Sequence, residues 1–295
     1  MSTAILFNPA AGRGRATVDA VVDEARHQFG DVTLLATERP GDGVRLGTLA
    51  AQQGFERVIA VGGDGTVHEA ANGILAAKVA RPPALTVVAQ GTGNDFAKLV
   101  GTHRRSPREA VRRIAAGTVA QFEVGEAWGE FFVNSLGIGL DHEVPFHLKS
   151  VTHFRGTPAY AIALFKALGG YRDIGLTVQI GETTYEGRWL TVAVGIGAIE
   201  GGGFHIMPGA SPEDGLLDVC AIRPVPLAKL VALIPLVMLA RHTGLREVTH
   251  TRATRVIFRG DAPLKIHSDG ELRSPGATEL TVTIHPAALT VIKAL

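Results

Sequence analysis

The sequence is poor in several features that would define a protein class by themselves. It contains one cysteine, Cys220, so no internal disulfide can form, and such usage is typical of a reducing compartment. Basic and acidic residues nearly cancel, 29 against 28, and a net charge of +1 provides no general attraction to nucleic acid. The most apolar segment, residues 227–240, contains Lys229 and Pro235 and is shorter than the roughly 20 residues of a membrane span.

The first residues also lack the basic flank and long apolar core of a signal peptide. Taken together, these absences predict a cytoplasmic protein without a nucleic-acid partner. Contact with a membrane surface and formation of a homodimer both stay open at this point.

Apolar residues and glycine are abundant instead. The 295 residues are 46% hydrophobic and include 36 glycines, enough apolar material for two globular domains. Before residue 123, helical patterns alternate with four strand-like apolar runs, at 4–7, 32–36, 57–62 and 85–89. This alternation predicts a Rossmann-like α/β domain with a doubly wound parallel sheet over residues 1–122.

Strand-like patterns dominate the rest of the chain. Their alternation of apolar and polar residues, interrupted by Gly-rich turns, predicts an all-β sandwich domain over residues 123–284. Residues 285–295 are a tail that could pack back on the first domain. The predicted strands of this domain lie at 130–139, 176–180, 188–197, 216–222, 255–260, 264–272 and 279–284.

Two helices of the first domain carry local start signals. Ser106 precedes Pro107 and is followed three residues later by Glu109, a capping box that predicts a helix near 107–116. The sequence VIAVGGDGTVHEAANGI, residues 58–74, predicts a strand, a glycine loop and then a helix that begins around Thr66.

Three glycine-containing loops follow three of the predicted parallel strands, at 8–15, 62–66 and 90–98. Loops at the carboxyl ends of neighbouring parallel strands converge on one edge of a sheet, and helix N-termini there favour phosphate. Asp64 would repel a phosphate unless a divalent cation lay between the two. The loops match neither the Gly-x-Gly-x-x-Gly dinucleotide fingerprint nor a Walker loop.

The same loops carry a family resemblance. Asn8-Pro9 with Gly12, GGDGT at 62–66 and GTGNDFA at 91–97 occur in the order found in the diacylglycerol kinase catalytic domain family. That family includes bacterial soluble lipid kinases and is related to sphingosine and ceramide kinases. The later segments 201–219 and SDGE at 268–271 resemble its further motifs. The resemblance implies the fold class above, ATP and Mg²⁺ as cofactors, and transfer of the γ-phosphoryl group to a lipid hydroxyl.

The resemblance also assigns roles to individual residues. It places ATP against four segments: Asn8, Pro9, Ala10, Ala11 and Gly12; Thr37; Gly62, Gly63, Asp64, Gly65, Thr66, Val67, His68 and Glu69; and Gly91, Thr92, Gly93 and Asn94. Two groups of metal ligands are implied: Asp64, Asp95 and Glu123, and a second site of Ser211, Asp214 and Leu216.

Catalysis would depend on Asp64 and on the pair Asp269 and Glu271. One member of the pair would accept the proton of the lipid hydroxyl, and the other would orient the hydroxyl or belong to the metal network. Glu123 departs from the family, which has Asp at the corresponding position, and is longer by one methylene group.

Two alternatives to a lipid kinase are compatible with parts of the sequence. An NAD kinase-like enzyme shares the GGDG sequence, and a non-catalytic lipid- or nucleotide-binding regulator could use the same fold. Zinc catalysis is disfavoured because Asn72 stands where a His-Glu-x-x-His helix would need its second histidine. The apolar segments 157–171 and 227–240 are candidates for contact with acyl chains or a membrane surface.

Overall fold

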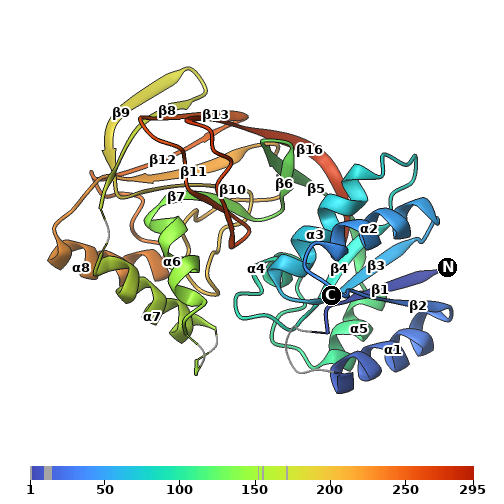
Figure 1. The fold of residues 1–295 in the computed structure, drawn as a ribbon. Coiled ribbons are helices and arrows are strands. Elements are labelled where there is room, and N and C mark those ends of the chain that lie inside the picture. Colours follow the sequence, from blue (N-terminus) through green and yellow to red (C-terminus); the bar gives the residue numbers. More distant parts are fainter. Residues whose placement is uncertain (1, 10–14, 152, 155, 171) are drawn as a thin grey trace. The chain divides into compact units, whose positions relative to one another are not determined.

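The computed structural model describes residues 2–9, 15–151, 153–154, 156–170 and 172–295 (Figure 1). The chain divides into two compact units, one of residues 1–122 and 287–295 and the other of residues 123–286. Two long strands, β5 (Thr118–Ala127) and β16 (Glu279–Lys293), contain residues of both units.

The first unit is a doubly wound α/β fold. Its strands lie in the order β2-β1-β3-β4 and all four pair in parallel, and the last part of β16 continues the sheet beside β4. Strands β1 and β3 are almost wholly buried, whereas β2 lies at the sheet edge and is largely exposed. The strands are β1 (Thr3–Phe7), β2 (Val32–Ala36), β3 (Arg57–Gly62) and β4 (Ala84–Ala89), and the helices are α1 (Arg15–Phe29), α2 (Asp42–Gln52), α3 (Asp64–Ala76), α4 (Asp95–Leu99) and α5 (Pro107–Ala115).

Of the two predicted helix starts, that of α5 is confirmed and that of α3 differs by two residues. Helix α5 begins at Pro107, and the Ser106 side chain accepts the amide hydrogen of Glu109, so the predicted cap is confirmed. Helix α3 begins at Asp64 rather than around Thr66. Gly63 is extended and acts as its N-cap, so the helix follows the strand after one residue. Asp64 is therefore the first helical residue and not part of a loop.

The second unit contains a β-sandwich, as predicted. One layer is a six-stranded antiparallel sheet in the order β12-β11-β10-β7-β14-β15, and the other is formed by β8, β9 and β13 with the first part of β16. A cluster of buried apolar residues, including Phe132, Trp189 and Phe258, fills the space enclosed by the strands. The strands are β6 (Glu130–Phe132), β7 (Ser135–Gly139), β8 (Ile174–Ile180), β9 (Thr183–Trp189), β10 (Thr191–Gly195), β11 (Leu217–Ile222), β12 (Val248–Ala253), β13 (Arg255–Gly260), β14 (Ile266–Ser268) and β15 (Glu271–Arg273).

Three helices accompany the sandwich in the second unit: α6 (Leu140–Leu148), α7 (Thr157–Leu168) and α8 (Leu227–Met238) (Figure 1). The helical spacing of α7 was predicted from the sequence, whereas α6 was not. Apolar residues of all three helices pack against Ala193 and Cys220 on the face of the six-stranded sheet opposite the sandwich core. Within the described residues, no helix has both the length and the apolar composition needed to cross a bilayer.

Candidate functional site

The glycine loops after β3 and β4 lie side by side at the carboxyl edge of the parallel sheet. The amide of Gln90 donates to the carbonyl of Gly62 at 2.8 Å. A Cβ placed on Gly91 would lie 2.6 Å from the Cα of Gly63, so only a residue without a side chain fits there. The sequence-based prediction that these two loops converge is confirmed.

The loop after β1 reaches the same edge. The amide of Asn8 lies 3.5 Å from the carbonyl of Val61, and the amide of Thr37 donates to the carbonyl of Phe7 at 2.9 Å. Asn8, Pro9 and Thr37 therefore lie near the ends of the central strands. The predicted ligands Ala10, Ala11 and Gly12 lie outside the described residues.

Asp64 and Asp95 begin neighbouring helices, α3 and α4. Oδ1 of Asp64 accepts the backbone amide of Phe96 at 3.1 Å, so Asp64 binds the first turn of α4 beside Asp95. Asp95 is buried, and Nζ of Lys98 lies 2.5 Å from its Oδ1. The structure thus brings the two predicted carboxylates to one edge and places a lysine there that the sequence analysis had not assigned.

The loop at 91–94 is closed by its own side chain. Oδ1 of Asn94 accepts the amide of Gly91 at 2.8 Å, and Nδ2 donates to the carbonyl of the same residue at 2.7 Å. Asn94 has a left-handed backbone with φ of 54°, a conformation that Asn tolerates better than most residues. Nζ of Lys98 also donates to the carbonyl of Gly93 at 3.2 Å. Asn94 therefore shapes the loop rather than extending from it.

Several residues predicted to bind nucleotide have structural contacts of their own. Both carboxylate oxygens of Glu69 accept amides at the start of α2, from Gly41 at 3.0 Å and from Gly43 at 2.8 Å. Val67 and His68 are buried. Thr66 is buried against Gly62, where an added Cβ would overlap the threonine side chain. In this stretch, the backbone and the N-terminus of α3 are the groups suited to an anion.

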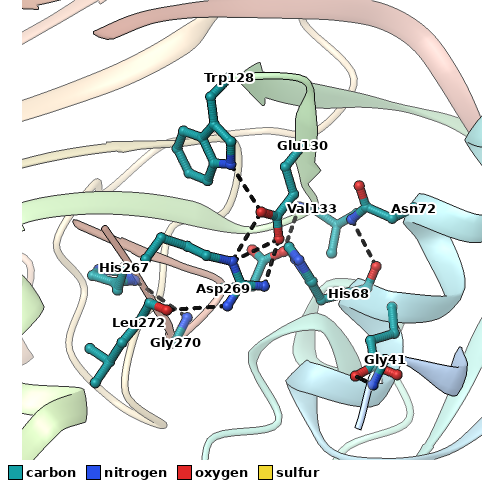
Figure 2. A network of polar contacts seen from close by, with 12 residues as sticks. Gly41, His68, Asn72, Trp128, Glu130, Val133, His267, Asp269, Gly270 and Leu272 are labelled. Carbon is teal, nitrogen blue, oxygen red and sulfur yellow. Dashed lines mark hydrogen bonds and ion pairs between the residues drawn. The ribbon is translucent and has the colours of Figure 1, made fainter. Parts of the chain in front are cut away.

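Asp269 is the most elaborately held carboxylate of the predicted set. It accepts three consecutive backbone amides, from Val133 at 3.0 Å, Asn134 at 2.8 Å and Ser135 at 3.1 Å. Figure 2 shows the contact with Val133 within a wider polar network. A carboxylate has about four lone-pair positions, so three donors fix its orientation closely. These amides had not been predicted, because backbone donors leave no mark on the sequence.

Glu271 differs from Asp269 although only Gly270 separates them. Asp269 is buried with φ of 48°, whereas Glu271 is exposed at the start of β15. Nearby, the guanidinium of Arg273 contacts both oxygens of Glu130 at 2.6 to 3.0 Å. Nε1 of Trp128 donates to the same carboxylate at 3.1 Å (Figure 2). The acidic turn therefore presents one buried, oriented carboxylate and one exposed carboxylate.

Glu123 lies against the predicted second metal segment. Its Oε2 accepts the amide of Gly215 at 2.5 Å, and its own amide donates to the carbonyl of Pro212 at 2.9 Å. Among the described residues, none hydrogen-bonds its buried Oε1. Burial raises the pKa of Glu123 to about 7, and the negative charges of Asp214 and Asp218 contribute to the shift.

The segment around Asp214 has the geometry of a tight turn. Oδ1 of Asp214 accepts the amide of Leu216 at 3.1 Å, and Oγ of Ser211 accepts the amide of Glu213 at 3.4 Å. The structure brings Glu123 together with the Ser211 to Leu216 segment. A shared network of Glu123 with Asp64 and Asp95 stays a prediction.

A doubly wound α/β unit with glycine loops at its carboxyl edge, followed by a sandwich that carries an acidic turn, is the architecture of diacylglycerol kinase-like phosphotransferases. Residues 2–127 match the model of the diacylglycerol kinase catalytic domain, and residues 134–293 match the YegS C-terminal NAD kinase beta sandwich-like domain. The chain therefore belongs to the diacylglycerol kinase family and is a lipid kinase at the level of that family.

Individual relatives agree with this assignment. A diacylglycerol kinase of Bacillus subtilis is 26% identical over 273 residues, covering 90% of this chain and 88% of the relative. A diacylglycerol kinase of Staphylococcus saprophyticus is 26% identical over 275 residues, covering 90% and 88%. The fold matches a crystal structure of a diacylglycerol kinase from Bacillus anthracis with a TM-score of 0.75 at 20% identity, covering 99% of this chain and 96% of that one.

Proposed function

We propose that this enzyme transfers the γ-phosphoryl group of ATP to the hydroxyl of a diacylglycerol-like lipid, with Mg²⁺. The observation that carries the proposal is the contact between the Gly63 and Gly91 loops with Asp64 and Asp95 beside them. Close glycine backbones and a helix N-terminus suit a polyphosphate, and acidic side chains there suit its accompanying cation.

We call the sheet edge formed by the loops at 62–66 and 90–98 the nucleotide edge. In this proposal it would act mainly by positioning the phosphates of ATP. Backbone amides at the start of α3 would bind phosphate oxygens, and Thr92 would add a hydroxyl. Lys98 neutralises Asp95 and orients that carboxylate. Mg²⁺, when bound, would shield the negative charge of the phosphates, and Asp64 would hold it, directly or through water, with Asp95 nearby.

The acidic turn would provide the chemistry at the acceptor. A lipid hydroxyl must lose its proton as it attacks the γ-phosphorus, and a carboxylate of fixed orientation can accept that proton. Asp269 supports this role better than Glu271, because three amides hold it in place whereas Glu271 is exposed. Glu271 would then orient the hydroxyl or the acceptor headgroup.

A second cation fits the Glu123 segment on grounds internal to this chain. A buried carboxylate with an orphaned oxygen and further acids nearby is a costly arrangement that a divalent cation would relieve. Asp214 and the backbone carbonyls of Ser211 and Leu216 would supply the remaining oxygen ligands. We therefore propose Glu123 as a ligand of this second cation. Its predicted membership of the metal-ligand group with Asp64 and Asp95 is kept in the proposal.

Contact with a membrane surface belongs to the proposal as well. Phe165 on α7 is 56% exposed, and Leu227 and Leu239 at the two ends of α8 are 62% and 64% exposed. Large apolar side chains of this kind favour insertion at a lipid interface, where an insoluble acceptor is found. Flotation with anionic vesicles should retain the wild type and lose the Phe165→Asp and Leu239→Asp variants.

The decisive experiment is an acceptor panel. Purified protein is incubated with γ-labelled ATP and either diacylglycerol, other hydroxylated lipids or NAD, with and without Mg²⁺. Label in lipid phosphate that requires Mg²⁺ supports the proposal, and Asp64→Asn serves as the inactive control. Transfer to NAD alone would support an NAD kinase-like enzyme, and nucleotide binding without transfer to any acceptor would support a non-catalytic regulator.

A further inference from the structure

One row of directly paired residues crosses the six-stranded sheet of the second unit. From β12 to β14 it contains His250, Cys220, Ala193, Gly137 and His267. Side chains of directly paired residues point to the same face of a sheet, so this row lies opposite the sandwich core. The small residues Ala193 and Gly137 leave space on the sheet surface beside the ring of His267.

Two acids occupy that space. A Cβ on Gly137 would overlap Oδ2 of Asp141 and crowd Nε2 of His267, so glycine is required for the two groups to meet. Ligand atoms of Asp141, Glu200 and His267 all lie within 4.8 Å of one another. His267 is 3% exposed and Glu200 is 7% exposed, so the group is enclosed.

The contacts of the His267 ring determine its tautomer. Nδ1 of His267 faces the backbone amide of Gly270 at 3.3 Å and can only accept from it (Figure 2). The neutral ring therefore carries its proton on Nε2. That nitrogen lies 2.9 Å from Oδ2 of Asp141, but the two atoms are not aligned as a hydrogen bond. The ring links a carboxylate on α6 to the backbone of the acidic turn.

This tautomer argues against a metal ion at the cluster, although two carboxylates and an imidazole could surround one. A metal on Nε2 would require the ring proton to move to Nδ1, where it would meet the amide hydrogen of Gly270. Histidines that bind metal have the opposite arrangement, since their second nitrogen donates to an acceptor. The geometry thus fits a histidine that supports the turn.

The turn needs such support because its backbone is unfavourable. Asp269 and Gly270 both have left-handed φ angles, 48° and 82°, and this conformation costs free energy for a residue with a side chain. The amides of residues 133–135 hold the side chain of Asp269. His267 supplies the contact to the next peptide group, through the amide of Gly270.

We propose that His267 is a positioning residue that holds the Asp269–Gly270–Glu271 turn in its catalytic geometry by accepting the amide hydrogen of Gly270, with the carboxylate of Asp141 beside its Nε2. The role rests on the proposed function of the turn. The titratable groups around the ring are Asp141 and His142 of α6, Glu200 and, further along the row, Cys220.

Two substitutions test the two nitrogens of the His267 ring one at a time. Asn places an acceptor oxygen near the position of Nδ1, whereas Gln places a donor near Nε2. We expect His267→Asn to keep kcat within about threefold and His267→Gln to lower it by about tenfold to a hundredfold, with KM for ATP unchanged in both. His250→Gln, on the same row of the sheet, is the matched control and should keep the wild-type kcat.

Ring ¹⁵N shifts and amide exchange test the same idea without enzyme activity. We expect an Nε2–H tautomer and a protected Gly270 amide in the wild type, and loss of that protection only in His267→Gln. Equal kcat in both variants, an Nδ1–H tautomer, or a shift of the ring signals on titration with Zn²⁺ would overturn the proposal. If the protein phosphorylated no lipid but showed the expected tautomer and protection, the proposed function would fail and the turn contact would stand.

Discussion

The nucleotide edge of the first unit and the acidic turn of the second are built by opposite means. At the nucleotide edge, the lack of side chains on glycine lets two backbone segments lie in contact, as Gly63 and Gly91 do. At the acidic turn, backbone amides from residues 133–135 are used to orient one side chain, Asp269. The glycine contact joins two short motifs that can be read from the sequence, whereas the orientation of Asp269 depends on residues more than 130 positions away.

The largest effect is expected from Asp64→Ala. The variant loses the carboxylate that binds the start of α4 and would hold the cation, so kcat/KM should fall by about a thousandfold or more. Steady-state kinetics with saturating lipid measure the change, and circular dichroism confirms the fold. A folded variant with nearly normal kcat/KM would remove Asp64 from the catalytic machinery.

Asp269→Asn and Glu271→Gln sharpen the contrast inside the acidic turn. In Asp269→Asn, an NH₂ group replaces one of the two carboxylate oxygens and cannot accept from the backbone N–H facing it. Both kcat and stability should therefore drop, the latter by about 1–3 kcal/mol. Glu271 lies on the surface, so Glu271→Gln should lower kcat but change the free energy of unfolding by less than about 0.5 kcal/mol. Urea unfolding measures the stability of each variant and steady-state kinetics measure its kcat. Equal destabilisation of the two variants would contradict the different roles of Asp269 and Glu271.

Gly91→Ala tests the glycine contact of the nucleotide edge. Its Cβ would lie 2.6 Å from the Cα of Gly63, so we expect about 1–3 kcal/mol of destabilisation and weaker ATP binding. Gly244→Ala is the control, because no atom lies within 4 Å of the Cβ it would add. Calorimetry and thermal unfolding compare the two variants. Unchanged ATP affinity in Gly91→Ala would mean that the loop only connects β4 to α4.

The last prediction concerns the pH dependence of stability at Glu123. Its pKa is about 7 in the folded protein against 4.5 in the unfolded chain, so the folded state binds more protons over that interval. Stability from the neutral carboxyl is complete below pH 4.5 and is lost as pH rises through about 7, by roughly 3 kcal/mol. Glu123→Gln should flatten this part of the curve.

Mg²⁺ supplies the companion measurement for Glu123. A cation favours the ionised carboxylate, so it should raise the melting temperature of the wild type more at pH 8 than at pH 5. Glu123→Gln should show a smaller increase at pH 8. The same increase in both proteins would place the cation elsewhere.

Much of the fold follows from patterns that are local in the sequence. The parallel strands β1, β3 and β4 were predicted almost to their ends because their apolar runs are bounded by glycine or proline, and the Ser106 cap specified the start of α5. Helix α6 was missed because it follows β7 without a polar boundary and contains Pro145. Strand β12, rich in Thr and His, lacked the apolar alternation by which the other strands were found.

The candidate site also has features that are local in the sequence and features that depend on distant residues. The motifs and the family resemblance they carry nominated Asp64, Asp95, Asp269 and the glycines as candidates, and their roles stay predictions. Only the tertiary structure showed that Asp269 is oriented by three amides and Glu271 is exposed, that Glu123 contacts Gly215, and that His267 meets Asp141 over Gly137. These contacts join residues distant in sequence, and their partners are often backbone groups that every residue has. The sequence by itself therefore determined which chemistry is present, and the packing of strands and helices decided how each group is held.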